Sequence, residues 1–266
     1  MYNSNDILNN FKKLPAMPNV ITHALGIIKD PESSIKELAK IVSYDQALST
    51  QVLTLVNSAY YGFAQQVTSI TRAISLIGMS KAKNIIMTVA MQPMLTNQGD
   101  KDLWKHSLTT AVGCEYLAQR LKIMDADEAF VVGFLHDLGK IILKLQDTRL
   151  YEKVKETSKL NPNILEVEKM YYGTDHCIMG SLLAKKWQLP LLVANTVKYH
   201  HMPNLSSMPT VCSLVYFVDA LVQENFDYAN LDKDAMNNLN LHIDQPQILQ
   251  EQILEKAQLL LNELST

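Results

Sequence analysis

The sequence of 266 residues is poor in cysteine and carries no excess of basic charge. Its three cysteines are far apart and lie in apolar helical contexts, which argues against a disulfide framework and for buried thiols in a reducing cytosol. The formal net charge is -3, so the chain lacks the basic surface that nucleic acid or an anionic membrane would attract. Neither is therefore expected as a partner.

Long apolar runs are missing as well. No segment approaches the roughly 20 apolar residues that span a bilayer. The polar residues 1–6 also lack the positive region of a secretory signal. These absences favour a soluble protein of the cytoplasm.

Alternation of apolar and polar residues, the pattern of half-buried strands, is scarce. Apolar residues instead recur at three- and four-residue spacing along almost the whole chain, which predicts an all-α fold. Helices are expected over residues 4–13, 18–29, 35–42, 46–59, 69–77, 80–91, 101–121, 127–145, 151–160, 164–172, 176–187, 190–201 and 209–224, with an amphipathic helix after residue 244. Gly139 is expected to loosen the helix over 127–145 before residues 141–145.

Local signals predict several of these helix ends. Ser34 and Glu37 form a candidate capping box. Asp45 and Asp127 are candidate caps of the helices that follow them. Pro93 is expected to lie beyond the end of its helix, because proline interrupts helical hydrogen bonding.

Residues 96–100 are the most loop-like segment in the first half of the chain. We therefore predict a domain boundary there. It separates an N-terminal helical lobe, residues 1–97, from a second helical domain, residues 98–266.

Residues 133–140 read Gly-Phe-Leu-His-Asp-Leu-Gly-Lys and place polar groups inside an apolar helix. Burial of His136 and Asp137 is costly unless a metal ion, a hydrogen-bond network or each other satisfies them. Lys140 follows within one turn. Asp137 and Lys140 are the candidate catalytic residues, with Lys140 able to add a positive contact to a phosphate.

Further histidines and one aspartate interrupt other apolar helices, which gives seven candidate metal ligands. Four could hold one ion, and seven could hold two ions about 3.5–4 Å apart, the arrangement used for phosphoryl hydrolysis. Imidazole with carboxylate suits Fe, Mn, Zn or Ni better than Mg. The candidate ligands are His106, His136, Asp137, His176, His200, His201 and Asp219.

A structural role is the alternative for each of these residues. A single histidine on an apolar helix is more often a hydrogen-bonded core residue than a ligand, and Asp219 could simply pair with a nearby histidine. Cys177, beside His176, is interpreted as a buried thiol rather than a ligand. The coincidence of several such groups in one half of the chain favours a metal site.

Several motifs together resemble the HDOD family, a branch of the HD-domain superfamily, over roughly residues 11–220. The motifs are Leu14-Pro15-Ala16-Met17-Pro18, Asp45-Gln46-Ala47-Leu48, Asn57-Ser58-Ala59-Tyr60-Tyr61-Gly62, Ala73-Ile74-Ser75-Leu76-Ile77-Gly78, His106-Ser107, Leu135-His136-Asp137-Leu138-Gly139-Lys140, His176-Cys177-Ile178-Met179-Gly180, Trp187-Gln188-Leu189-Pro190 and His200-His201.

This resemblance implies an N-terminal helical lobe packed on an HD-type helical bundle and a bacterial signalling or regulatory role. The similarity to HD-type phosphohydrolases implies a core metal set of His106, His136, Asp137 and Asp219. The similarity to HD-GYP phosphodiesterases implies that His176, His200 and His201 supply a second metal, and Lys140 matches the lysine of those enzymes.

The chain departs from HD-GYP enzymes after His201, where Met202-Pro203-Asn204-Leu205 replaces their Gly-Tyr-Pro loop. No receiver, kinase or cyclase segment is recognised, so a signal is expected to arrive through a signalling partner protein in trans or a small ligand. Three functions stay open. They are a regulatory interaction protein, a metal-dependent phosphohydrolase of a nucleotide or other phosphoester, and a di-metal sensor of redox state or a gas.

Overall fold

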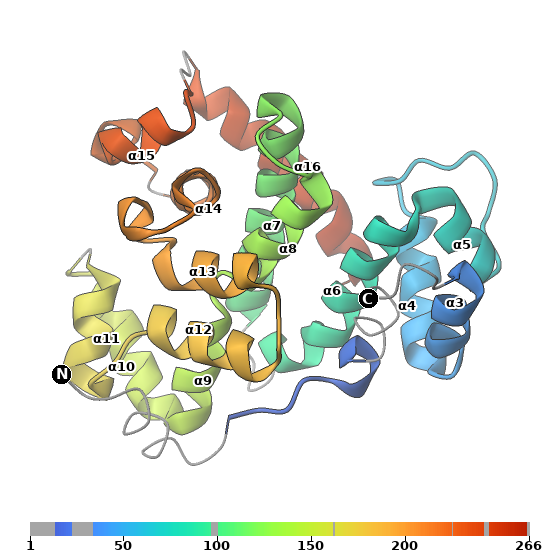
Figure 1. Ribbon diagram of the computed structural model, residues 1–266, viewed down its shortest axis with the longest axis horizontal. Helices are drawn as coiled ribbons and strands as arrows, with labels where there is room; N and C mark the ends of the chain where they lie inside the picture. The colour runs from blue at the N-terminus through green and yellow to red at the C-terminus, as the bar shows by residue number, and fades with distance from the viewer. Residues whose placement is uncertain are drawn as a thin grey trace. The chain divides into compact units, whose positions relative to one another are not determined.

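The structure, a computed structural model, describes residues 14–22, 34–96, 101–161, 163–224, 226–241 and 245–264. Within these ranges the ordered elements are α-helices and short 3-10 helices, and no β-strand occurs (Figure 1). The predicted all-α class is confirmed. The helix expected over residues 4–13 lies outside the described residues, as does most of 18–29, of which residues 19–22 are helical.

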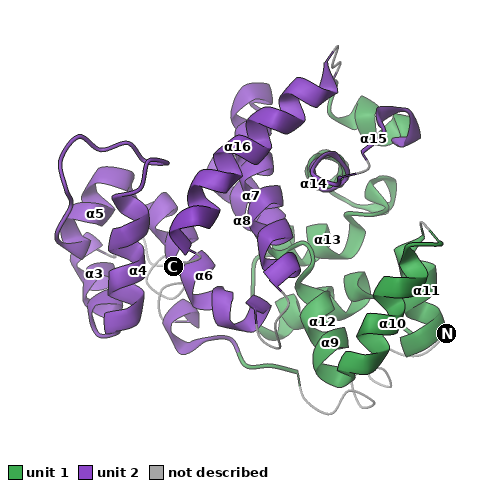
Figure 2. Ribbon diagram, turned by 180° about the vertical axis from the view of Figure 1, so that it is seen from behind, with its two compact units in different colours: residues 1–16, 135–217, 232–240 green, residues 17–134, 218–231, 241–266 purple. Residues whose placement is uncertain are grey.

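The chain divides into two compact units that interleave along the sequence (Figure 2). Unit 1 comprises residues 1–16, 135–217 and 232–240, and unit 2 comprises residues 17–134, 218–231 and 241–266. Residues on both sides of position 97 therefore belong to unit 2. The boundary expected at that position stays a prediction about which segments fold independently.

Unit 2 begins with helices whose starts follow from local capping. In α3 (Ile35–Ser43), the Ser34 hydroxyl accepts from the Glu37 amide, and the Glu37 carboxylate accepts from the Ser34 amide at 2.8 Å. In α4 (Gln46–Val56), Asp45 accepts from the Leu48 amide at 3.0 Å. Both predicted caps are confirmed, since each depends only on residues within one turn.

Helix α4 ends at Val56, earlier than the expected end near Ala59. Asn57 leaves the helix because its side chain clamps the loop that follows. It donates to the Val67 carbonyl at 2.8 Å and accepts from the Val67 amide at 2.7 Å. Gly62 lies in the turn between them with φ +62°, a backbone angle that favours glycine.

The next two helices of unit 2 are α5 (Ile70–Ile77) and α6 (Met79–Thr96). The expectation that Pro93 lies beyond the end of its helix is wrong, because α6 continues past it. Met91 and Leu95, on either side of Pro93, are buried at 1% and 4% exposure. Their burial outweighs the hydrogen bond that proline removes.

Unit 2 also contains α7 (Lys101–Leu121), with the expected bounds, α8 (Ala126–Leu135) and the C-terminal α16 (Pro246–Leu264). Helix α16 packs on α7. The cap of α8 is Asp125, which accepts from the Glu128 amide at 3.0 Å, and not Asp127 as expected. Asp127 instead lies in the first turn, where its carboxylate faces Lys81 at 3.9 Å.

Unit 1 is built around consecutive helices that follow His136 and Asp137 and continue beyond His201. Helix α12 packs on both α9 and α13. The elements are α9 (Leu138–Gln146), α10 (Thr148–Ser158), α11 (Ile164–Tyr172), α12 (His176–Lys186), α13 (Leu191–Tyr199) and the 3-10 helix η2 (Pro203–Leu205).

Two more helices follow η2. In helix α14 (Pro209–Leu221), residues up to 217 belong to unit 1 and the residues from 218 onward belong to unit 2. The 3-10 helix η3 (Tyr228–Asn230) belongs to unit 2. Helix α15 (Lys233–Asn238) was not expected, because its sequence is short and polar. It is held by Asp232, which accepts from the Ala235 amide, and by Asn238, which donates to Ser213 at 3.1 Å.

Two of the sequence motifs meet inside unit 1. Trp187 Nε1 donates to the Pro15 carbonyl at 3.0 Å, and Lys186 Nζ donates to the Leu14 carbonyl at 3.3 Å. The segment before the first described helix is thus attached to the end of α12. Among the described helices, none combines the length and apolar character that crossing a bilayer requires.

Candidate metal centre

His136 and Asp137 lie in the turn between α8 and α9, and the expectation that they lie inside one helix is wrong. The close packing of α9 on α12 accounts for the break. A Cβ atom at Gly139 would lie 1.8 Å from the His176 carbonyl oxygen and 2.7 Å from the Gly180 amide nitrogen. Gly139 therefore permits backbone contact between two helices and, with it, the turn that presents His136 and Asp137.

His176 is the first residue of α12 and is held in place by a buried carboxylate. Glu168 of α11, only 1% exposed, lies 2.7 Å from His176 Nδ1 and also accepts from the His176 amide at 2.8 Å. A carboxylate at this nitrogen assigns the proton to Nδ1 and leaves Nε2 as the metal-binding atom.

His200 caps the end of α13 and is oriented in the same way. Its Nδ1 donates to the Val197 carbonyl at 2.9 Å, so its Nε2 lone pair also points away from that bond. His201 follows it in the chain, with its ring centre 4.2 Å from that of His200. Consecutive residues at a helix end thus bring two imidazoles to one place.

The Nε2 atoms of the three histidines converge. His176 Nε2 lies 3.3 Å from His200 Nε2 and 3.2 Å from His201 Nε2, and Asp137 Oδ1 lies 3.4 Å from His176 Nε2. Two neutral imidazoles with protonated Nδ1 atoms cannot hydrogen bond to each other through Nε2. A cation or an extra proton between them satisfies both, so the donor set fits a divalent metal ion.

Without a metal ion, one additional proton between His176 Nε2 and His200 Nε2 satisfies both nitrogens. Burial opposes protonation of His176, but the neighbouring Cys177 and Glu168 raise the pKa of its imidazole well above the usual value. Burial, together with His201 and His136, lowers the pKa of His200 well below the usual value. His176 therefore donates through Nε2 to His200, and a bound metal ion would replace that proton.

Asp137 is a carboxylate despite its complete burial. Burial alone would raise its pKa, but His136 and Lys140 hold that pKa well below its usual range. His136 Nε2 lies 3.3 Å and Lys140 Nζ lies 2.6 Å from Asp137 Oδ2. The other carboxylate oxygen of Asp137, Oδ1, faces His176. Lys140, which was expected to contact a phosphate, donates to Asp137 Oδ2.

His106 and Asp219 lie in unit 2, on α7 and α14. His106 Nε2 is 3.0 Å from Asp219 Oδ1, and their side chains are 19% and 15% exposed. Asp219 thus pairs with a histidine within unit 2, which was the structural alternative to a role as a metal ligand. Their role as metal ligands stays a prediction.

Sequence reasoning missed Glu168 as part of the centre. Its signal is spacing, because it follows the buried Leu165 by three positions and so shares the buried face of α11. A carboxylate on such a face needs a partner. Cys177 was interpreted as a buried thiol, and it is buried, but its Sγ atom also lies 3.6 Å from His176 Nε2.

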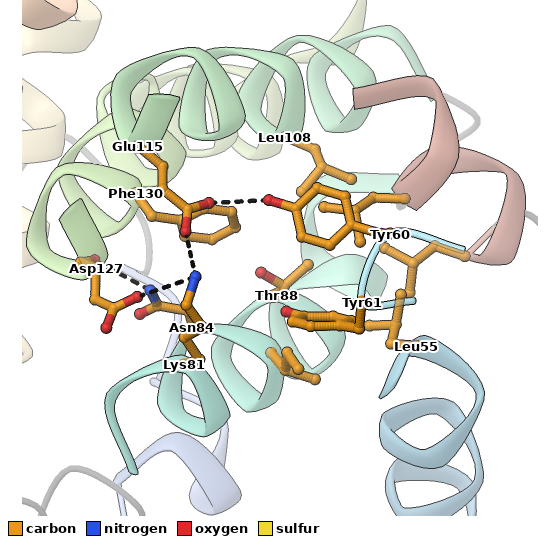
Figure 3. Close-up of a pocket in the computed structure, with 13 residues that line it drawn as sticks. Leu55, Tyr60, Tyr61, Lys81, Asn84, Thr88, Leu108, Glu115, Asp127 and Phe130 are labelled. Atoms are coloured by element: carbon orange, nitrogen blue, oxygen red, sulfur yellow. Dashed lines mark hydrogen bonds and ion pairs between the residues drawn. The ribbon is translucent and has the colours of Figure 1, made fainter. Parts of the chain in front are cut away.

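A separate polar cluster lies in unit 2 (Figure 3). Glu115 of α7 accepts from the Tyr60 hydroxyl at 3.0 Å and from Lys81 Nζ at 2.7 Å. Burial and Glu115 raise the pKa of Tyr60, so its hydroxyl stays protonated and donates. A pocket of about 20 Å³ lined by these residues suits about one water molecule beside the Thr88 hydroxyl. This cluster anchors the Tyr60 turn to α6 and α7.

Known proteins resemble this chain in sequence and in fold. The HDOD domain family matches residues 14–203. An uncharacterized protein of Treponema pallidum (strain Nichols) is 27% identical over 213 residues, which cover 76% of this chain and 40% of that protein. The chain thus spans well under half the length of this relative.

Two solved structures share the fold. A candidate phosphohydrolase of Shewanella amazonensis SB2B has a TM-score of 0.76 and 21% identity, with 97% of each chain covered. A candidate signal transduction protein of Marinobacter aquaeolei VT8 has a TM-score of 0.80 and 19% identity, covering 99% of this chain and 66% of the other.

Proposed function

This chain belongs to the HDOD family, and we propose that it is a bacterial signal-transduction protein that acts through protein interaction and holds a divalent metal ion in unit 1. The observation that carries this proposal is that Nε2 of His200, Nε2 of His201 and Oδ1 of Asp137 all lie close to His176 Nε2. Imidazole with carboxylate suits Fe, Mn, Zn or Ni.

The surroundings of the ligands support a resident ion. Glu168 and the Val197 carbonyl fix the orientation of two imidazoles, as hydrogen-bond partners of metal-ligating histidines commonly do. Lys140 offsets part of the Asp137 charge without occupying Oδ1. These partners prearrange the donors, which lowers the entropic cost of binding an ion.

Burial favours a regulatory over a hydrolytic use of the ion. His136, His176 and His200 are 0% exposed and Asp137 is 1% exposed. Hydrolysis requires an open coordination position and room for a substrate beside it. The fold shared with a candidate signal transduction protein agrees with this choice.

A metal-dependent phosphohydrolase is the second candidate function, because Lys140 combines a 22% exposed side chain with contact to Asp137. In such an enzyme the ion would lower the pKa of a bound water, while Lys140 would bind the phosphate of the substrate. The fold shared with a candidate phosphohydrolase also agrees with it.

The metal content of protein purified without chelators tests the proposal. Wild type is expected to hold one or two equivalents of a divalent transition metal, and His176→Ala to lose the unit 1 ion while remaining helical by circular dichroism. The His106→Ala variant measures whether the pair in unit 2 contributes ligands. A metal-free wild type would contradict both candidate functions.

Hydrolysis distinguishes the two functions. Metal-loaded protein is assayed on a panel of nucleotides and phosphodiesters with Mn²⁺ or Fe²⁺, beside Asp137→Ala as control. The regulatory proposal expects no turnover. Turnover that disappears in Asp137→Ala would establish the phosphohydrolase instead, whereas equal rates in both proteins would identify a contaminating enzyme.

A further inference from the structure

Cys177 directly contacts the histidine cluster from within α12. It follows His176 in the chain and is only 2% exposed. Its Sγ atom lies 3.6 Å from His176 Nε2 and 3.9 Å from His200 Nδ1. Ligand atoms of His176, Cys177, His200 and His201 all lie within 4.8 Å of one another. A thiol therefore borders the site proposed for the ion.

The three distances from His176 Nε2 match edges of a tetrahedral coordination shell. Zinc bonds of about 2.0–2.1 Å to nitrogen and about 2.3 Å to sulfur imply nitrogen–nitrogen edges of about 3.3 Å and nitrogen–sulfur edges of about 3.6 Å. The nitrogen–nitrogen distances from His176 are 3.3 Å and 3.2 Å, and the nitrogen–sulfur distance is 3.6 Å.

We infer that Cys177 is a thiolate ligand of the unit 1 ion, which three imidazoles and one sulfur hold as a zinc site. This inference rests on the proposed function, because it requires an ion at the cluster. On binding, the thiol loses its proton to solvent and sulfur forms a bond to the metal. No change of oxidation state is involved.

Asp137 is the competing fourth ligand, since its Oδ1 atom lies 3.4 Å from His176 Nε2 and 3.9 Å from His200 Nε2. The two choices predict different metals. A nitrogen–oxygen set accepts Mn²⁺ and Fe²⁺, whereas thiolate sulfur favours Zn²⁺. Four protein ligands including sulfur also close the shell, as in zinc sites that stabilise structure rather than catalyse.

The other two cysteines provide matched controls. Cys212 contacts Ser206 Oγ at 3.1 Å and Asn195 Oδ1 at 3.6 Å. Cys114 lies in unit 2, on α7. Both are fully buried, as Cys177 nearly is, so Cys→Ser at each position makes a comparable change to the protein.

Cobalt substitution tests directly, by absorption spectroscopy, whether a thiolate binds the metal ion. The full chain is freed of metal with a chelator, reloaded with Co²⁺ and followed by absorption. Wild type, Cys114→Ser and Cys212→Ser are expected to show a thiolate-to-cobalt charge-transfer band in the near ultraviolet together with visible bands of tetrahedral Co²⁺. Cys177→Ser is expected to lose the charge-transfer band and keep bound cobalt.

The outcomes separate this inference from the proposed function. Visible cobalt bands without a charge-transfer band in wild type would overturn the thiolate ligand and leave the metal site standing. No cobalt binding at all would overturn both. A charge-transfer band that persists in Cys177→Ser would assign the sulfur to another cysteine and overturn the inference.

X-ray absorption of the zinc-loaded wild type gives the same answer without any variant, in case Cys177→Ser does not fold. One sulfur at about 2.3 Å with nitrogen at about 2.0–2.1 Å is the expected zinc shell. A shell of nitrogen and oxygen alone would contradict the inference.

Discussion

At the scale of single residues, the hydrogen bond that a histidine makes through Nδ1 determines whether its Nε2 atom can bind a metal ion. The bonds from His176 to Glu168 and from His200 to the Val197 carbonyl assign both Nδ1 protons and turn both Nε2 atoms toward each other. Sequence reasoning found the histidines because they interrupt apolar helices. It missed Glu168 because the spacing from Leu165 shows only that this carboxylate lies on a buried face, and its partner, His176, lies on the next helix.

Glu168→Gln tests the orienting role of this carboxylate. The amide keeps the shape of the side chain but loses its charge, so metal affinity is expected to fall by about 10- to 100-fold. Competition with a chromophoric chelator measures the change. Glu166→Gln, on the exposed face of the same helix, is the control and should bind like wild type. Equal affinity in Glu168→Gln would show that the carboxylate only supports folding.

Metal affinity should rise with pH. The pKa of His176 is raised well above its usual value, so below that pKa the metal-free site holds a proton that the ion must displace. Each released proton is then expected to strengthen binding by about tenfold per pH unit, which gives one such factor for His176 and a second for the Cys177 thiol where that thiol also binds the ion. Titrations between about pH 6 and 8 measure this slope. An affinity independent of pH would contradict the shared proton.

At the scale of helices, the accuracy of prediction followed the range of the interactions involved. Of the predicted caps, which depend on contacts within one turn, those at Ser34 and Asp45 were confirmed, whereas the cap expected at Asp127 is two residues earlier, at Asp125. Pro93 and Asn57 were misjudged, because burial on both sides of the proline and a clamp on Val67 come from the tertiary fold. The turn at His136 was missed for the same reason, since contact of Gly139 with α12 is not a local signal.

Gly139→Ala tests the backbone contact between α9 and α12. The added Cβ atom would lie 1.8 Å from the His176 carbonyl oxygen, and backbone cannot move aside as a flexible side chain can. The free energy of unfolding should fall by about 3 kcal/mol or more. Urea denaturation measures it, and His176 should bind metal more weakly in the variant.

Gly173→Ala serves as the control for this substitution. Gly173 has φ +72° and nothing within 4 Å of an added Cβ atom, so only about 1–2 kcal/mol of backbone strain is expected. A loss in Gly139→Ala no larger than this would show that α9 and α12 separate at little cost.

At the scale of the whole molecule, the two compact units are assembled from segments far apart in sequence. Unit 1 takes residues 1–16 as well as 135–217, and Trp187 holds Pro15 by a hydrogen bond. A loop-like stretch near residue 97 says nothing about which distant helices pack together. The spacing of apolar residues therefore predicted the fold class, and the boundary near residue 97 stays a prediction.

Metal binding is expected to stabilise unit 1 in particular. An ion at 100 times its Kd adds about 2.7 kcal/mol to the free energy of unfolding, because it binds the folded state. Hydrogen exchange should then slow in α12 and α13 and change little in α3 to α5. Equal protection of both sets of helices, or protection that persists in His176→Ala, would place the ion elsewhere.

The position of the ion is the central claim, and anomalous X-ray scattering from crystals of the metal-loaded protein measures it most directly. The expected result is an anomalous peak within bonding distance of Nε2 of His176, His200 and His201. A metal-loaded crystal with no peak there, or with its peak bound by other residues, would contradict the account.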